Sequence, residues 1–296
     1  MSGAPRPVAR GEGWDARRVA LVVTAAVGAA FLLIVAVNRW GVPSDEQAYL
    51  LAAQRLVAGQ PLYDPAAVPG TPYAYWYPPP LAQVLAPFTL FVPDLVYMVA
   101  WTVLLLGCLF WLADRRLLVA LAMVAFPPVA IELWYRNIHL VLAVLVVLAL
   151  RRSVLFWVPA VAIKVTPVIG VAYLVAARRY RDAALVAVVG GVVLAISVLL
   201  SPDAWSQFVS EVLVRGGTSG SSLVPVPFVL RFAVAAALAA TGGRVGGRWG
   251  EVALIVALVV GNPTLWMTAF SLLIAIVPLW RSARDPAPAG PRMVGG

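Results

Sequence analysis

Residues 19–37 read VALVVTAAVGAAFLLIVAV, nineteen consecutive residues without a charged side chain. The hydrocarbon layer of a bilayer is about 30 Å thick, and a helix of about 20 apolar residues crosses it. Arg17 and Arg18 precede the run, and Asn-Arg-Trp follows it at 38–40. The run is longer than the apolar part of a secretory signal, and no small-residue cleavage site follows it. We therefore expect a retained transmembrane helix, preceded by a cytoplasmic tail at residues 1–18.

Apolar runs of this kind fill most of the chain. Of the 296 residues, 62% are hydrophobic and 12% are charged, whereas soluble domains use roughly 45–50% apolar residues. Several runs have only 12 or 13 residues, so they cross only when tilted, or are re-entrant or buried among other helices. The further runs lie near residues 79–91, 94–112, 117–133, 138–150, 154–177, 183–200, 222–240, 250–261 and 263–280. The sequence predicts an all-α, polytopic transmembrane helical bundle with about 8–10 membrane segments over residues 19–281, and a cytoplasmic tail at 282–296.

The distribution of positive charge along the chain also fits a membrane protein. The formal net charge is +9, and most arginines stand at the ends of apolar runs. That distribution is typical of the positive-inside rule, so we expect membrane lipids as partners and no nucleic acid. The single cysteine, Cys108, lies in an apolar run, which excludes a disulfide framework.

Two stretches, 38–78 and 201–221, interrupt the apolar pattern and are expected to be extracytoplasmic loops. In the long loop after the first helix, Ser44 stands before Asp45 and Glu46, and apolar residues then recur at helical spacing until Gly59. This pattern predicts an N-capped amphipathic helix. Residues 203–214 form a second amphipathic stretch that suits the membrane surface.

The arginines also orient the segments. If residues 79–91 dip into the membrane and return, nearly all arginines fall on the cytoplasmic side, provided that Ser153 to Ala177 is re-entrant. If residues 79–91 cross fully, Arg115, Arg116, Arg151 and Arg152 move outside and the bias weakens. Both arrangements describe a multi-pass protein of the cell membrane with a cytoplasmic N-terminus.

Ionisable residues inside apolar runs are costly and are candidates for function. They are Glu132, Arg136, His139, Lys164 and Arg231. Lys164 is the only lysine beside 21 arginines, and Pro159 and Pro167 flank it. An ammonium is a compact charge that can hold a phosphate. The alternative is a lysine that reaches the interface or pairs with a carboxylate.

The segment 132–139 brings an acid, a cation, an amide and the only histidine together. The alternative is a set of polar residues around a helix end, with interfacial aromatics beside them. One histidine without cysteines falls short of a zinc site. Asp45, Glu46 and Asp64 could share a divalent ion, but three acids in one loop are weak evidence, so no metal ligands are assigned. The aromatic run at 73–77 suits either sugar rings or a membrane interface.

Taken in order, five pieces resemble a known family. They are Ser44-Asp45-Glu46-Gln47-Ala48-Tyr49, then residues 56–63 (LVAGQPLY), Tyr77-Pro-Pro, Arg136-Asn-Ile-His139 and Ala162-Ile-Lys164-Val-Thr-Pro167. Over roughly residues 19–200 the chain resembles glycosyltransferase family 87, membrane enzymes of the GT-C fold. The resemblance implies transfer of a hexose, mannose in the family's α-mannosyltransferases, from a polyprenyl-phosphate sugar donor to a glycolipid or glycan acceptor by inversion on the extracytoplasmic face.

The resemblance also implies roles for single residues. Asp45 corresponds to the general base, and Lys164 to a cation near the lipid phosphate. The residues expected to bind substrate are Lys164, Arg136, Asn137, His139, Tyr49, Tyr77 and Glu46. The chain departs from the family pattern at Arg136, where glycine is usual, and in its shorter length, which puts the acceptor pocket in doubt.

Two other classes of function compete with this interpretation. Broken helices with charges such as Lys164 and Arg231 also suit a lipid or solute transporter or flippase. A non-catalytic membrane scaffold that has degenerated from the family is the third possibility.

Overall fold

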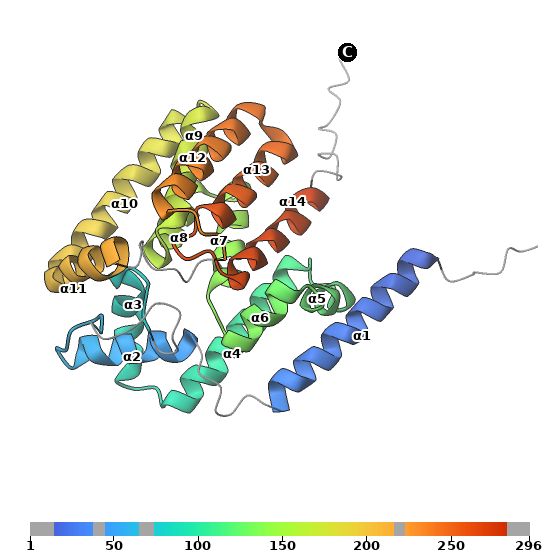
Figure 1. Cartoon of the computed structure of the whole chain (residues 1–296), viewed down its shortest axis with the longest axis horizontal. Helices are drawn as coiled ribbons and strands as arrows, with labels where there is room; N and C mark the ends of the chain where they lie inside the picture. The colour runs from blue at the N-terminus through green and yellow to red at the C-terminus, as the bar shows by residue number, and fades with distance from the viewer. Residues whose placement is uncertain (1–14, 38–44, 65–73, 216–222, 283–296) are drawn as a thin grey trace, which may run out of the picture.

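The computed structural model describes residues 15–37, 45–64, 74–215 and 223–282, and every regular element in these ranges is helical (Figure 1). The predicted all-α class is confirmed. The expectations for most of both tails, for Ser44, and for parts of the two loops fall outside these ranges.

The helices follow one another with short connections. In chain order they are α1 (Ala16–Val37), α2 (Asp45–Val57), α3 (Pro79–Thr89), α4 (Asp94–Leu112), α5 (Leu117–Val124), α6 (Pro127–Tyr135), α7 (His139–Arg151), η1 (Val154–Phe156), α8 (Trp157–Ile163), η2 (Thr166–Val168), α9 (Ile169–Ala176), α10 (Tyr180–Leu200), α11 (Pro202–Gln207), the π-helical η3 (Phe208–Arg215), α12 (Phe228–Val245), α13 (Gly247–Val260), η5 (Met267–Ala275) and α14 (Ile276–Ser282).

Four of these helices, α1, α4, α10 and α12, are long and apolar enough to cross a membrane. The pair α5 and α6 makes a fifth span if it counts as one, although it bends by 88°. Phe126, before Pro127, is extended at the bend, because the residue before a proline avoids the helical region. The described residues thus contain four or five full-length spans, and the remaining apolar runs fold as shorter or broken helices, as their short lengths led us to expect.

Helix α1 lies at the edge of the bundle beside α5 and α6 (Figure 1). Only Ala25 and Gly28 of this helix are buried. A Cβ atom on Gly28 would lie 1.8 Å from the carbonyl oxygen of Leu121, so the glycine allows α5 to approach closely. The rest of α1 exposes apolar side chains such as Leu33, which is 66% exposed. Such a surface is stable against lipid rather than water.

Arginines lie at one end of the bundle, where α7 ends and α13 begins. Arg151, the last residue of α7, makes a two-pronged ion pair with Glu251 of α13, with one N–O distance of 2.6 Å. Arg248 lies 4.7 Å from the ring centre of Trp280 in α14. Gly243, near the end of α12, packs against the carbonyl of Tyr173 in α9. The ends of α7, α9, α12 and α14 therefore meet the start of α13 at this end.

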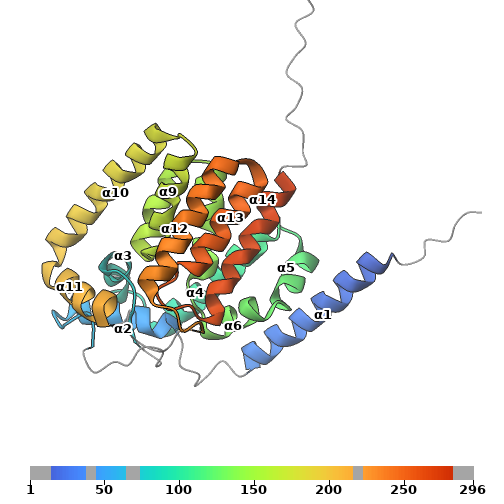
Figure 2. The ribbon, with the colours of Figure 1, turned by 45° about the horizontal axis from the view of Figure 1, so that its top comes forward.

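Helices α2, α3 and α11 lie at the opposite end (Figure 2). Both flanks of residues 79–91 contact α2: Tyr77 accepts a hydrogen bond from Tyr49 (3.0 Å), and Asp94 accepts one from Gln54 (3.1 Å). The segment thus returns to the side from which it starts. This agrees with the dipping arrangement rather than the crossing one.

Residues 153–177 form a hairpin of short helices. Lys164 separates α8 from η2, and its Nζ lies 2.7 Å from His139 at the start of α7. Because α7 ends at Arg151, α8 must run back antiparallel to it. Helix α9 then returns to the arginine-bearing end, where Tyr173 meets α12. The hairpin therefore begins and ends on the same side, as the re-entrant arrangement requires, and Lys164 lies at its tip.

Candidate active site

The predicted amphipathic helix is α2, which begins at Asp45. Apart from Glu46 its inner face carries no charge, and Ala48, Tyr49 and Ala53 are no more than 2% exposed. Gly59 follows the helix with φ +66°, a left-handed conformation that glycine adopts at little cost. The helix thereby holds Asp45 at its first turn, against the junction of α6 and α7.

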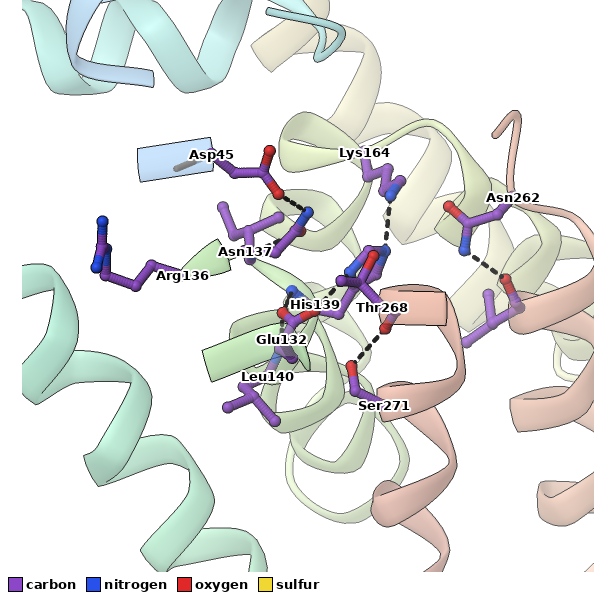
Figure 3. A network of polar contacts seen from close by, with 12 residues as sticks. Asp45, Glu132, Arg136, Asn137, His139, Leu140, Lys164, Asn262, Thr268 and Ser271 are labelled. Carbon is purple, nitrogen blue, oxygen red and sulfur yellow. Dashed lines mark hydrogen bonds and ion pairs between the residues drawn. The ribbon is translucent and has the colours of Figure 1, made fainter. Parts of the chain in front are cut away.

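Asn137 in that junction holds the carboxylate of Asp45. Its side-chain Nδ2 donates to Asp45 Oδ2 (Figure 3). Its Oδ1 accepts the Tyr77 hydroxyl (3.2 Å) and the backbone N–H of Ile138 (2.6 Å). Because two donors occupy the oxygen, the amide NH₂ group must face the carboxylate.

Lys164 approaches the same junction from the hairpin tip. Its Nζ lies 2.7 Å from His139 Nε2, and His139 Nδ1 lies 3.1 Å from Glu132 Oε2. The ammonium also lies 5.4 Å from the ring centre of Tyr77. The structure thus brings together five residues predicted from sequence: Asp45, Tyr77, Asn137, His139 and Lys164.

Electrostatics connect the acid with the cation. Removal from water raises the pKa of Asp45 to about 6, and the negative charge of Glu132 adds to the rise. The hydrogen bond from Asn137 and the positive charges of Lys164 and Arg136 act in the opposite direction. A carboxyl group with a pKa just below neutrality is suited to accept a proton from a substrate.

Arg136 and Glu46, also predicted to bind substrate, form an ion pair with each other. Arg136 Nε lies 2.6 Å from Glu46 Oε1, and the two side chains are 3% and 0% exposed. The Arg136 side chain points away from Lys164 and His139 (Figure 3). Its backbone is left-handed, with φ 53°, and its carbonyl accepts the indole N–H of Trp101 (2.9 Å). The predicted role of this pair in substrate binding stays a prediction.

Two of the aromatic residues before the proline run, Tyr75 and Tyr77, are buried. Tyr75 and Tyr77 are each 7% exposed and pack against Tyr49 and Tyr63. The Tyr75 hydroxyl donates to the carbonyl of Pro78 (2.9 Å). This cluster fastens α3 to α2, and Tyr77 carries the network onward to Asn137.

Sequence reasoning missed the partnership of Glu132 with His139. It identified both residues as ionisable groups in an apolar run, but the helix break at 136–138 turns one toward the other. The sequence did contain a signal for this pairing. Glu132 stands seven residues before His139, and the end of a helix lies between them.

Arg231 lies outside the cluster. Its guanidinium donates to the carbonyls of Val226 (3.0 Å), Asn262 (2.6 Å) and Pro263 (2.7 Å). It therefore neutralises the carbonyl-rich end of α13 and fixes the loop that follows. This role is structural and requires no transported charge.

Among the residues that the structure describes, no group of three or more His, Cys, Asp or Glu side chains is arranged to hold a metal ion. Of the three acids considered for a divalent ion, Glu46 pairs with Arg136, and Asp64 lies 3.7 Å from Arg55. The site is therefore built from a carboxylate, an ammonium and the groups that orient them.

Comparison with known proteins identifies the family. The sequence model of glycosyltransferase family 87 matches residues 75–294. The chain belongs to glycosyltransferase family 87. It is therefore a membrane glycosyltransferase, as its resemblance implied. No curated protein and no solved structure matches the chain.

The family 87 match overlaps the expected range, residues 19–200, from residue 75 onward. It extends to residue 294, and it includes the segments that carry Tyr77, Asn137, His139 and Lys164. It begins after Asp45, so the acid is connected to the family through its contacts with Asn137 rather than through the match itself.

Proposed function

We propose that this family 87 enzyme transfers a hexose from a polyprenyl-phosphate donor to a hydroxyl of a glycolipid or glycan acceptor, and that the hexose is mannose. The observation that carries the proposal is the proximity of a carboxylate and an ammonium: Asp45 begins α2, Lys164 stands in the break after α8, and their charges are close enough to act on each other. Each is held by a separate hydrogen bond, one to Asn137 and one to His139.

The transfer is a single displacement. The acceptor oxygen attacks the anomeric carbon while its proton passes to the Asp45 carboxylate. The new bond forms between that oxygen and the carbon, and the bond from the carbon to the phosphate oxygen breaks. The electron pair leaves with the phosphate, and the Lys164 ammonium stabilises the charge that develops there. One displacement inverts the anomeric configuration.

The orientation of the bundle supports an extracytoplasmic reaction. The arginine-bearing end, with Arg151 and Arg248, suits the cytoplasmic side under the positive-inside rule. Helix α2, which begins at Asp45, lies at the opposite end (Figure 2). A lipid-borne donor would keep its polyprenyl chain in the bilayer while its phosphate meets Lys164.

The proposal is tested by a transfer assay with purified protein in membranes. Polyprenyl-phosphate mannose is compared with polyprenyl-phosphate glucose, and membrane lipids serve as acceptors. Asp45→Asn and Lys164→Ala are expected to lower transfer by about 10²–10³-fold. Asp182→Asn alters an exposed acid that pairs with Arg179, and it should transfer like the wild type.

The stereochemistry of the product provides a second test. Nuclear magnetic resonance of the isolated product should give an anomeric configuration opposite to that of the donor. Undiminished transfer by Asp45→Asn, or a product with retained configuration, would refute the proposed mechanism. Activity with the glucose donor alone would refute the choice of mannose and leave the mechanism standing.

A further inference from the structure

Glu132 has no part in the transfer step, yet its side chain is fully buried. Its Oε1 accepts the backbone N–H groups of His139 (2.6 Å) and Leu140 (3.3 Å). These N–H groups belong to the first turn of α7, and the N-cap residue Ile138 provides no side-chain hydrogen bond to them. Glu132 therefore caps α7 from the preceding helix. The free N–H groups at a helix start favour a carboxylate at this position.

The second oxygen of Glu132 faces the imidazole of His139. Oε2 lies 3.1 Å from Nδ1. The two backbone N–H groups on Oε1 favour the ionised form of Glu132. In that form the carboxylate can only accept hydrogen bonds, so Nδ1 carries the proton. In the neutral ring, Nε2 is then left with its lone pair free to accept. The carboxylate thus selects one of the two tautomers of His139.

That lone pair meets the ammonium of Lys164 at 2.7 Å. An ammonium only donates hydrogen bonds, so the contact requires the tautomer that Glu132 selects. Lys164 has extended backbone, with φ −151° and ψ 140°, just after the last residue of α8. A flexible four-carbon side chain at such a position samples many rotamers unless a partner holds its end. The bond to His139 occupies one N–H of the ammonium and leaves two for other acceptors.

We infer that Glu132 and His139 form a positioning pair that holds the Lys164 ammonium in the direction of the phosphate of the lipid-linked sugar donor. This inference rests on the proposed function for the identity of that phosphate. Neither residue of the pair touches the reacting atoms. His139 acts through Lys164, and Glu132 acts through the tautomer of His139.

A double-mutant cycle tests the first link. His139→Leu should lower kcat/KM for polyprenyl-phosphate mannose by about 10–100-fold, as misplacement of a catalytic group does. In a Lys164→Ala background the same change should cause no further loss, because the group that it positions is gone. Losses that multiply in the double variant would overturn the inference. As a control, Ser197→Ala removes a buried hydroxyl away from the site. Its effect on kcat/KM should multiply with that of Lys164→Ala.

Two further variants test the tautomer. Glu132→Gln is nearly isosteric, but its amide can donate to Nδ1 and so force the proton onto Nε2, against the ammonium. It should lose activity as His139→Leu does. His139→Gln keeps an acceptor oxygen and should recover part of the activity lost in His139→Leu. Full activity in Glu132→Gln would contradict the second link.

A spectroscopic measurement separates this inference from the proposed function. Lys164 is the only lysine in the chain, so protein grown with ¹⁵Nζ-lysine gives a single side-chain ammonium signal. In the absence of donor, its shift and its hydrogen exchange rate should change in His139→Leu and Glu132→Gln. They should stay unchanged in Ser197→Ala. An unchanged signal in the first two variants would overturn the positioning pair even if transfer is observed. A changed signal together with full activity in Lys164→Ala would uphold the pair and refute the role of Lys164 in transfer.

Discussion

Replacing Arg136 with glycine tests the buried ion pair between α2 and the α6–α7 junction. Arg136 has a left-handed backbone, with φ 53°, which costs an L-residue about 1–2 kcal/mol that glycine avoids. The same change leaves the Glu46 carboxylate, 0% exposed, without its cation. Loss of one partner from a buried pair costs about 3–5 kcal/mol. We therefore expect Arg136→Gly to destabilise the protein by about 1–4 kcal/mol, despite the relief of backbone strain.

A second substitution should reverse this loss. In the double variant Arg136→Gly and Glu46→Leu, no charge is stranded and the relaxed backbone remains. Replacement of a buried ion pair by apolar groups is often neutral or stabilising. The double variant should therefore be at least as stable as the wild type, whereas Arg136→Gly alone should unfold at a temperature lower by about 2–6 °C.

The chain provides a reporter for this measurement. Cys108 is the only cysteine and is partly buried, so a fluorogenic maleimide follows unfolding on heating. As a control, Arg55→Ala, in the same helix as Glu46, removes an exposed ion pair with Asp64. It should change the free energy of unfolding by less than about 1 kcal/mol. If Arg136→Gly is as stable as the wild type, or if the double variant is as unstable as Arg136→Gly, the reasoning about the stranded carboxylate is wrong.

Three further predictions follow from the described geometry. Transfer measured as kcat/KM should rise with pH through about 6, because burial, helped by the charge of Glu132, raises the pKa of Asp45 to about 6 and a general base must be deprotonated; a flat profile from pH 5 to 7 would contradict this. Gly28→Val should separate α1 from α5 and lower the unfolding temperature, because its Cβ would meet the Leu121 carbonyl; Gly107→Ala, with open space around it, should be neutral or stabilise by up to about 1 kcal/mol. Arg231→Met should lower the unfolding temperature by stranding the carbonyls of Val226, Asn262 and Pro263, and Arg231→Lys should restore little of it because an ammonium cannot reproduce the guanidinium fork.

The membrane helices could be predicted from sequence because apolar length is a local property. The run at 19–37 is helical in the structure, and so is the amphipathic stretch that starts at Asp45. Which of the apolar runs cross completely could not be predicted, because hydropathy does not tell a crossing from a broken or returning helix. Phe126-Pro127 bends one apolar run by 88°, and Lys164 divides another.

The partners of the site residues could be predicted only in part. Asp45 and Lys164 were expected to lie near each other through the family resemblance, and they do interact. The pairing of Glu46 with Arg136, and the choice of His139 as the acceptor for Lys164, depend on how α2, the α6–α7 junction and the hairpin tip dock. These contacts join residues far apart in sequence, and no local pattern specifies them.

In the hairpin at 153–177, the lengths of the helical legs set the position and direction of the Lys164 ammonium. Each residue added to a helical leg advances its end by about 1.5 Å and rotates it by about 100°. Lys164 stands between two such legs, and both are anchored at the arginine-bearing end. A single insertion in α8 would therefore turn the ammonium away from Nε2 of His139, while the same insertion in an exposed turn would leave its aim unchanged. The length of α8 is thus as much a determinant of the site as the chemistry of its side chains.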